Sequence, residues 1–276
     1  MNKWNRHIFV FLVILTSYQL FAQKVKKEYN FSLVKLECPT DNNKLIDYYK
    51  SGFEALNYQW LANTAGKIFF NIIQEDKSLC DAYFYTGISL TKQDKHQAAL
   101  NYYYYADSLA TNSNADFKQA LAEAAVRVGN VGLARKKYEE LIKDFPNDPD
   151  AYYGMGLTAT SIGDVKNGLS NLLIAEEKYL LEGTWDTIRK SEVFLMRGIL
   201  FTMDKQYQEA INAFDHCSEV FNDLDDFNAN YALASYKLYQ ESQDEKWKEV
   251  SKTAFERIKA KDKLRKSYLE MFDYTD

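Results

Sequence analysis

The side chains that could do nucleophilic or acid–base chemistry are few in this chain of 276 residues. The run Asp215-His216-Cys217 holds an acid, a base and a thiol, which are the types that nucleophilic catalysis uses. On a helix, however, successive residues point about 100° apart and cannot converge on one substrate. His7 lies in an apolar N-terminal segment, and His96 lies in a polar stretch at a predicted turn. We therefore expect no catalytic residue among them.

Other kinds of reactive site also lack their residues. Carboxylate pairs such as Glu139-Glu140 and Glu176-Glu177 have the spacing of a solvated helix surface. The sequence contains no Gly-rich phosphate loop, no GxSxG and no HExxH motif. Three histidines and three cysteines without a CxxC pair assemble no metal set. The sequence predicts a protein that is not an enzyme and that uses no metal and no cofactor.

The composition favours long helices joined by short turns. Hydrophobic residues make up 46% of the chain, which is enough for a substantial core, but only 3 Pro and 11 Gly occur. An all-β fold would need a turn, usually marked by Gly or Pro, about every 8–12 residues. The net charge of −5 repels phosphate backbones, so we expect no nucleic-acid partner.

An internal repeat is clearest over residues 128–156. This stretch has Ala134 and Tyr138 in one helical segment, a stop at Pro146, and Gly156 in the next helical segment. It resembles the junction of two tetratricopeptide repeats. In that family a unit of about 34 residues has a small residue at position 8, Ala at position 20 and an aromatic residue at position 24.

The same register extends over residues 46–222. Units that begin near Ile46, Cys80, Ala115, Pro149 and Ser191 are spaced by 34, 35, 34 and 42 residues. Position 20 is small in every unit, being Ala65, Ala99, Ala134, Gly168 and Ala210. Position 8 is Phe53, Gly87, Ala122, Gly156 and Gly198, and position 24 is Phe69, Tyr103, Tyr138, Leu172 and Phe214.

The resemblance implies an all-α fold, an α-solenoid of about six tetratricopeptide-like helical hairpins that stack into a right-handed superhelix. Small residues at positions 8 and 20 would let the backbones of paired helices approach. The residue at position 24 would fill the gap between one hairpin and the next. The predicted repeats span residues 46–260. Their bounds are 46–79, 80–114, 115–148, 149–190, 191–224 and 225–260. A capping helix and tail would follow over residues 261–276.

The N-terminus predicts export. Lys3 and Arg6 precede an apolar run from Ile8 to Leu15, and a small residue, Ala22, marks a cleavage point. This is the layout of a signal peptide over residues 1–22, and the run is too short for the roughly 20 apolar residues of a membrane anchor. No Cys ends the run, so we expect a periplasmic or secreted protein without stable membrane insertion, not a lipoprotein. Residues 23–45 are predicted to be a flexible arm.

The cysteines leave alternatives open. An exported protein meets oxidising conditions, and the odd count of Cys38, Cys80 and Cys217 leaves at least one thiol unpaired. A Cys38–Cys80 bridge is conceivable. Cys217 occupies a repeat position that favours a small buried residue, so packing is its simpler role.

In the tetratricopeptide family a ligand lies in the concave groove, on first-helix positions 2, 5, 9, 12 and 13. Lys50 has position 5 of the first unit, but Glu54 at position 9 disfavours a clamp for a C-terminal carboxylate. In the later units the resemblance implies an apolar, partly charged groove that suits an extended peptide or an amphipathic helix. Its residues are Phe84, Ile88, Lys92, Gln119, Glu123, Arg127, Tyr153, Leu157, Thr160, Leu195, Ile199 and Met203. The alternative is that tight winding, or the N-terminal arm, covers this surface.

The sequence thus indicates an exported scaffold that binds a segment of another protein, with an envelope or secretion component as the expected partner. Two alternatives are a structural protein that self-associates through its repeats and an auxiliary subunit of a cell-envelope enzyme complex.

Overall fold

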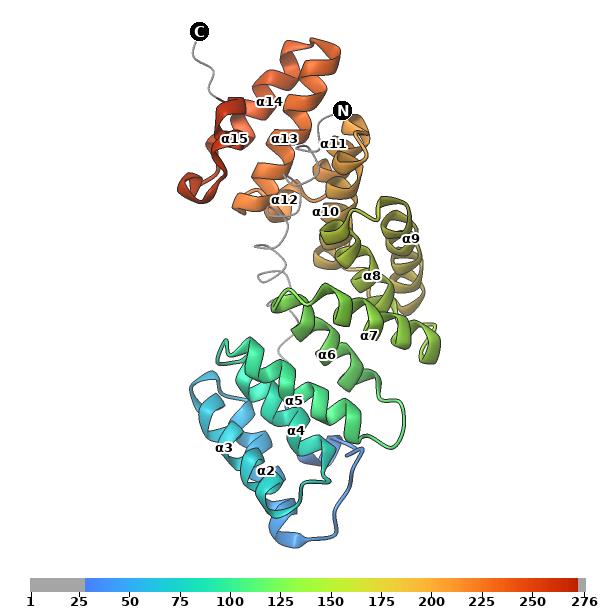
Figure 1. Cartoon of the computed structure of the whole chain (residues 1–276), viewed down its shortest axis with the longest axis vertical. Coiled ribbons are helices and arrows are strands. Elements are labelled where there is room, and N and C mark those ends of the chain that lie inside the picture. Colours follow the sequence, from blue (N-terminus) through green and yellow to red (C-terminus); the bar gives the residue numbers. More distant parts are fainter. Residues whose placement is uncertain (1–27, 273–276) are drawn as a thin grey trace. The chain divides into compact units, whose positions relative to one another are not determined.

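The structure is a computed structural model that describes residues 28–272, and over that range it contains helices and no strand. Figure 1 shows successive helices paired into hairpins. By its contacts the chain divides into two compact units, of which the described parts are residues 28–154 and 155–272. The predicted signal peptide and the first residues of the predicted arm lie outside the described residues. No helix over 28–272 is long and apolar enough to cross a membrane.

The unit of residues 28–154 contains three complete hairpins. α2 packs against α3, α4 against α5, and α6 against α7, while α3–α4 and α5–α6 contacts join neighbouring hairpins. The elements are η3 (Phe31–Leu33), α2 (Asn43–Leu56), η4 (Gln59–Leu61), α3 (Ala62–Glu75), α4 (Cys80–Thr91), α5 (His96–Leu109), α6 (Ala115–Arg127) and α7 (Val131–Asp144), followed by the first turns of α8 (Pro149–Ile162).

The unit of residues 155–272 begins within α8. Its elements are α9 (Val165–Glu182), α10 (Thr187–Met203), α11 (Tyr207–Asp215), α12 (Ser218–Phe221), α13 (Asp225–Ser242), α14 (Glu245–Glu256), η5 (Lys261–Lys263), α15 (Lys266–Leu269) and η6 (Glu270–Phe272). Over its described residues the predicted capping region thus contains three short helical pieces, η5, α15 and η6. Its Tyr268 and Phe272 are buried against Leu233 of α13 and Ala254 of α14, so it closes the apolar end of the last hairpin.

The predicted small positions lie where two helices nearly touch. A Cβ atom built on Gly87 would lie 2.6 Å from the ring of Tyr103, and one on Gly156 would lie 2.5 Å from Leu172. Each pair joins position 8 to position 24 of the same hairpin. In these two units the side chain at position 24 thus lies over the glycine of its own hairpin. In the first and third repeats it meets the next hairpin, as predicted, since Phe69 lies 5.4 Å from Tyr85 and Tyr138 lies against Gly154.

The turns inside the hairpins need left-handed backbone. Gly129 and Gly163 have φ of 76° and 74°, a conformation that glycine adopts without steric cost. In two other hairpins Asp94 and Lys205 take the same conformation, with φ of 58° and 64°. The glycines at 129 and 163 are therefore favoured by the conformation of the turn and not by close packing.

Candidate peptide-binding site

Residues 28–38, here called the strap, lie against the first two hairpins. The side chain of Asn57 holds the main chain of Tyr29 at both of its polar groups, since Oδ1 accepts from Tyr29 N at 2.7 Å and Nδ2 donates to Tyr29 O at 2.9 Å. This pairing recognises a peptide backbone whatever its side chain.

Two aromatic side chains of the strap enter the aromatic core of these hairpins. The ring of Tyr29 stacks on Phe53 with centroids 6.5 Å apart and meets Tyr85 edge-on at 6.4 Å. The ring of Phe31 lies 5.8 Å from Phe53 and 6.2 Å from Tyr49. Such pairs contribute roughly 0.5–1.5 kcal/mol each beyond the burial of their area. The strap is anchored by apolar burial as well as by hydrogen bonds.

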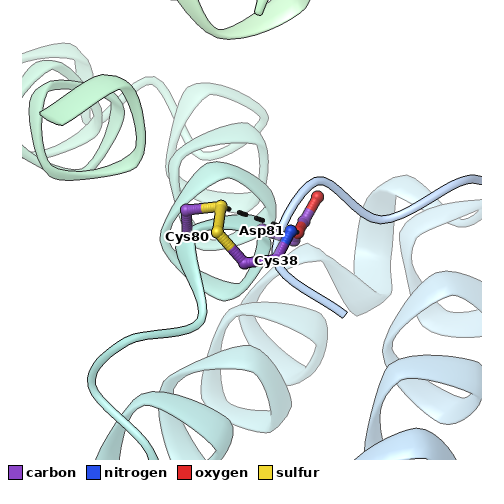
Figure 2. Close-up of side chains that lie close together, drawn as sticks. All are labelled: Cys38, Cys80 and Asp81. Atoms are coloured by element: carbon purple, nitrogen blue, oxygen red, sulfur yellow. Dashed lines mark hydrogen bonds between the residues drawn. A yellow bond between two sulfur atoms is a disulfide. The ribbon is translucent and has the colours of Figure 1, made fainter. Parts of the chain in front are cut away.

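The other end of the strap is fixed covalently to the first turn of α4. Cys38 forms a disulfide with Cys80, and the Cα atoms are 5.6 Å apart (Figure 2). The adjacent carboxylate of Asp81 accepts hydrogen bonds from Cys38 N at 2.7 Å and from Glu37 N at 3.2 Å. Burial raises the pKa of Asp81, and these two hydrogen bonds oppose the rise. The carboxylate therefore acts as a cap for the main chain of the strap.

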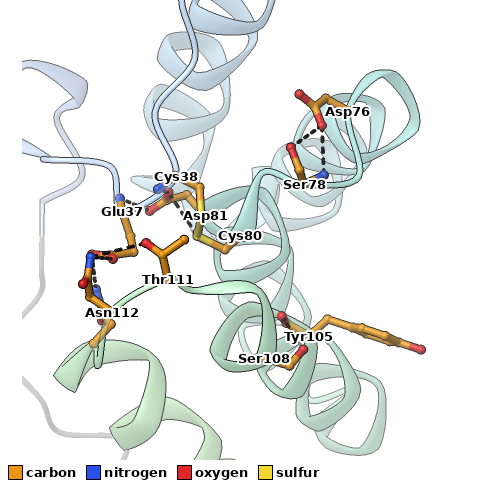
Figure 3. The surroundings of a disulfide bond; sticks show 11 residues. Glu37, Cys38, Asp76, Ser78, Cys80, Asp81, Tyr105, Ser108, Thr111 and Asn112 are labelled. Carbon is orange, nitrogen blue, oxygen red and sulfur yellow. Dashed lines mark hydrogen bonds between the residues drawn. A yellow bond between two sulfur atoms is a disulfide. The ribbon is translucent and has the colours of Figure 1, made fainter.

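The strap also reaches the loop between α5 and α6. The carboxylate of Glu37 accepts from the side-chain amides of Asn112 at 3.3 Å and Asn114 at 3.4 Å; Figure 3 shows the contact with Asn112. Asn114 is also the N-cap of α6. One acidic side chain thus links the strap to the start of the third hairpin.

These contacts place the strap along the positions that the family uses for ligands. Tyr29 lies near the carboxyl ends of α2 and α4, where Lys92 Nζ is 5.8 Å from its ring, and Cys38 lies at the amino end of α4. The strap therefore runs antiparallel to both helices. In the repeat register Asn57, Asp81 and Lys92 have positions 12, 2 and 13. Beside the strap is a hollow of about 410 Å³, and its lining includes Lys50 and Glu54 at positions 5 and 9.

The described part of the predicted flexible arm thus differs from the expectation. Residues 28–42 are held by the disulfide, by Asn57 and by aromatic contacts, and α2 begins at Asn43. This segment has no periodic pattern because its contacts are with residues distant in the sequence. The alternation of Tyr29 and Phe31 in a polar stretch is the signal that could have indicated a docked segment.

The predicted groove residues in the unit of residues 28–154 divide into two groups by their burial. Phe84 and Tyr153 are buried, at 7% and 3% exposed, so they are core residues and present no surface to a partner. The half-buried members lie on α4 and α6, and Gln119 Nε2 donates to Glu123 Oε1 at 2.7 Å. These half-buried residues are Ile88, Lys92, Gln119, Glu123 and Arg127.

In the unit of residues 155–272 most predicted groove residues are internal. Leu157, Thr160, Leu195 and Ile199 are at most 3% exposed, and only Met203 is half-buried. For α10 the cause is its contact with α9, α11 and α13, which cover the side chains of Leu195 and Ile199. We therefore remove the four buried residues from the candidate surface and keep the polar strip on α4 and α6.

The third cysteine is isolated and inert. Cys217 is 1% exposed, and burial raises the pKa of its thiol, which keeps it protonated. We expect a thiol reagent such as Ellman's to detect no thiol in the native protein and one after denaturation. It should detect three after denaturation and reduction, once the reductant has been removed. Three thiols without reductant would contradict the Cys38–Cys80 bridge, and a reactive native thiol would contradict the burial of Cys217.

Comparison with known proteins bears on the fold. No protein-family model and no curated protein matches the sequence. Among solved structures, a chain of the APC/C hetero-tetramer Cut9–Hcn1 superposes with a TM-score of 0.63 at 16% identity, covering 94% of this chain and 44% of that one. MamA (residue 41 to the end) from Desulfovibrio magneticus gives 0.57 at 16% identity, covering 66% and 97%. A tetratricopeptide repeat protein from Parabacteroides merdae gives 0.53 at 16% identity, covering 83% and 98%. The comparisons confirm that this chain has the all-α, tetratricopeptide-like fold that its repeat predicts.

Proposed function

We propose that this protein is a non-catalytic scaffold that binds an extended peptide, or a helix, of another protein. One observation carries the proposal: the inner positions of α2 and α4 already hold a separate stretch of polypeptide, the strap. The side chain of Asn57 donates to and accepts from its main chain, and the carboxylate of Asp81 accepts from it. Main-chain hydrogen bonds with side-chain sockets are a general mode of peptide recognition. On α6 the half-buried Gln119, Glu123 and Arg127 offer further polar contacts.

A peptide library displayed on phage and panned against the full chain tests this proposal. We expect selected peptides to bind the native protein and to lose about tenfold or more in affinity to Glu123→Lys, because the change reverses a charge on the candidate surface. Glu139→Lys on the exposed face of α7 is the matched control and should leave binding unchanged. Peptides that bind equally to both variants, or a library that yields none, would contradict a binding surface on α6.

We further propose that the scaffold is exported to the periplasm or the cell exterior, where its partner is an envelope or secretion component. The apolar run from Ile8 to Leu15 with Ala22 behind it supports export, and a disulfide is favoured in oxidising compartments. Expression of the full chain in a bacterium, followed by fractionation and mass measurement, tests this. Export predicts a product in the envelope or medium that begins after Ala22; an unprocessed cytosolic product would contradict it.

Self-association is the second candidate, and one feature favours it. Leu173, Leu180 and Leu181 on α9 are 62%, 55% and 79% exposed, and residues seven apart share one side of a helix. Light scattering with size-exclusion chromatography distinguishes the candidates. A concentration-dependent oligomer that Leu180→Lys dissociates would support self-association. A monomer at all concentrations would exclude self-association and favour the peptide-binding scaffold.

A further inference from the structure

The strap makes the contacts of a ligand more than those of a linker. Asn57 holds its main chain, the rings of Tyr29 and Phe31 fill aromatic sockets, and Asp81 caps its far end. All of these groups lie on α2 and α4, at or beside the ligand positions of the repeat. A segment that only joined two elements would not need a side chain dedicated to both main-chain polar groups of one residue.

We propose that the strap is a built-in ligand of a peptide site on α2 and α4, and that this site accepts in trans a peptide with the same side-chain pattern, bound with the single helical turn that the strap has at Phe31–Leu33. The pattern is two aromatic residues separated by one residue, as in Tyr29 and Phe31, with an acidic residue farther along, as in Glu37. This inference rests on the proposed peptide-binding function and names the chemistry of its ligand.

The sockets define that chemistry. Phe53, Tyr85 and Tyr49 form walls that favour aromatic rings over aliphatic or charged side chains. The amides of Asn112 and Asn114 donate hydrogen bonds, so they favour a carboxylate at the position of Glu37. Asn57 and Asp81 contact only the main chain and therefore place no restriction on the side chains between these anchors.

The native chain keeps this site closed to competitors. The strap continues into α2 through residues 39–42 and is tied to α4 by the disulfide, so its local concentration at the site is in the millimolar range or above. A free peptide of similar intrinsic affinity at micromolar concentration cannot displace it. The site opens only when the aromatic part of the strap leaves its sockets.

The experiment uses the full chain with Tyr29→Ala and Phe31→Ala, which empties the sockets while the disulfide remains. The probe is the fluorescein-labelled peptide EYNFSL, the sequence of residues 28–33, followed by fluorescence anisotropy. We expect this variant to bind the peptide at least about tenfold more tightly than the native chain does. Adding Asn57→Ala should weaken that binding by about tenfold, because two hydrogen bonds to the main chain are lost. A peptide in which both aromatic residues are Ala should not bind.

Two outcomes would overturn the proposal. If the variant retains its helical circular dichroism and cooperative unfolding but does not bind the peptide, the sockets are not an exchangeable site. If the variant unfolds, the strap is part of the core and not a ligand. A second variant adds Cys38→Ser and Cys80→Ala and is tested with the longer probe EYNFSLVKLE, which ends at Glu37. This probe should bind more tightly than EYNFSL if the carboxylate is an anchor, and equal binding would show that it is not. Neither outcome would affect the binding of selected peptides on α6, which is judged by its response to Glu123→Lys. The strap site and the proposed binding function are therefore tested separately.

Discussion

Replacing Cys38 with Ser and Cys80 with Ala is expected to lower the free energy of unfolding of the unit of residues 28–154 by about 4 kcal/mol. The two cysteines are 42 residues apart, and a cross-link over a loop of that length removes conformational entropy worth about 4 kcal/mol from the unfolded chain. Urea denaturation followed by circular dichroism, without reductant, measures the difference between native and variant proteins.

The native protein with reductant is the matched control for this effect. Reduction breaks the same bond without changing any other atom, so the reduced native protein should unfold close to the variant. The variant itself should not respond to reductant, because buried Cys217 has no partner for a disulfide. A native protein whose urea midpoint is the same with and without reductant would show that the bridge contributes nothing to stability.

The helical hairpins could be predicted because their signal is local and repeated. Small residues recur where backbones approach, and Gly87 and Gly156 show the reason, since no Cβ fits beneath Tyr103 and Leu172. Any residue with a side chain would push the paired helices apart, so a glycine at these places is a physical requirement. The sequence therefore predicts which helices pair. It also predicts that position 24 faces the next hairpin, as Phe69 faces Tyr85, but not that the same side chain covers the glycine of its own hairpin.

The candidate site was predicted less well because exposure is not a local property. Leu195 and Ile199 have first-helix positions that line a groove in the family, but in this chain α10 is enclosed by α9, α11 and α13. The position in a repeat gives the direction of a side chain and not what covers it. On α6 the equivalent positions 5 and 9 are the polar residues Gln119 and Glu123, which are half-buried. They remain accessible to a partner, as predicted.

The strap could be predicted only in part, for a related reason: the sequence leaves open a Cys38–Cys80 bridge and an arm that covers the groove, but it does not give the path between them. The distance of 5.6 Å between the Cα atoms of Cys38 and Cys80 depends on the path of the residues before α2, which carry no periodic pattern. Asn57 and Asp81 were not singled out either, because an Asn after a helix and an Asp at the start of a helix usually serve as local caps. Here Asn57 both accepts from and donates to the main chain of Tyr29, and Asp81 accepts from the main chain of Cys38. Each partner is more than 25 residues away in the sequence.

Replacing Phe214 with Ala is expected to destabilise the unit of residues 155–272 by about 3–5 kcal/mol. Phe214 is fully buried, lies over Gly198 of the paired helix, and meets the rings of Phe227 and Tyr231 at 5.9 and 5.8 Å. Truncation removes the ring from three neighbours at once and leaves a cavity that rigid helices cannot close. Leu181→Ala on α9, where the side chain is 79% exposed, is the control and should change stability by less than about 0.5 kcal/mol.

The same ring makes the effect of Gly198→Ala depend on its background. In the native protein a Cβ at residue 198 would overlap the ring of Phe214, so we expect this change to cost about 1–3 kcal/mol. In the Phe214→Ala protein the overlap is gone, and Ala is favoured over Gly inside a helix by about 0.5–1 kcal/mol, so the same change should stabilise. Urea denaturation of the four proteins gives both values. An equal effect of Gly198→Ala in the two backgrounds would show that the glycine is not there to admit the ring, and the pairing of positions 8 and 24 would lose its physical basis.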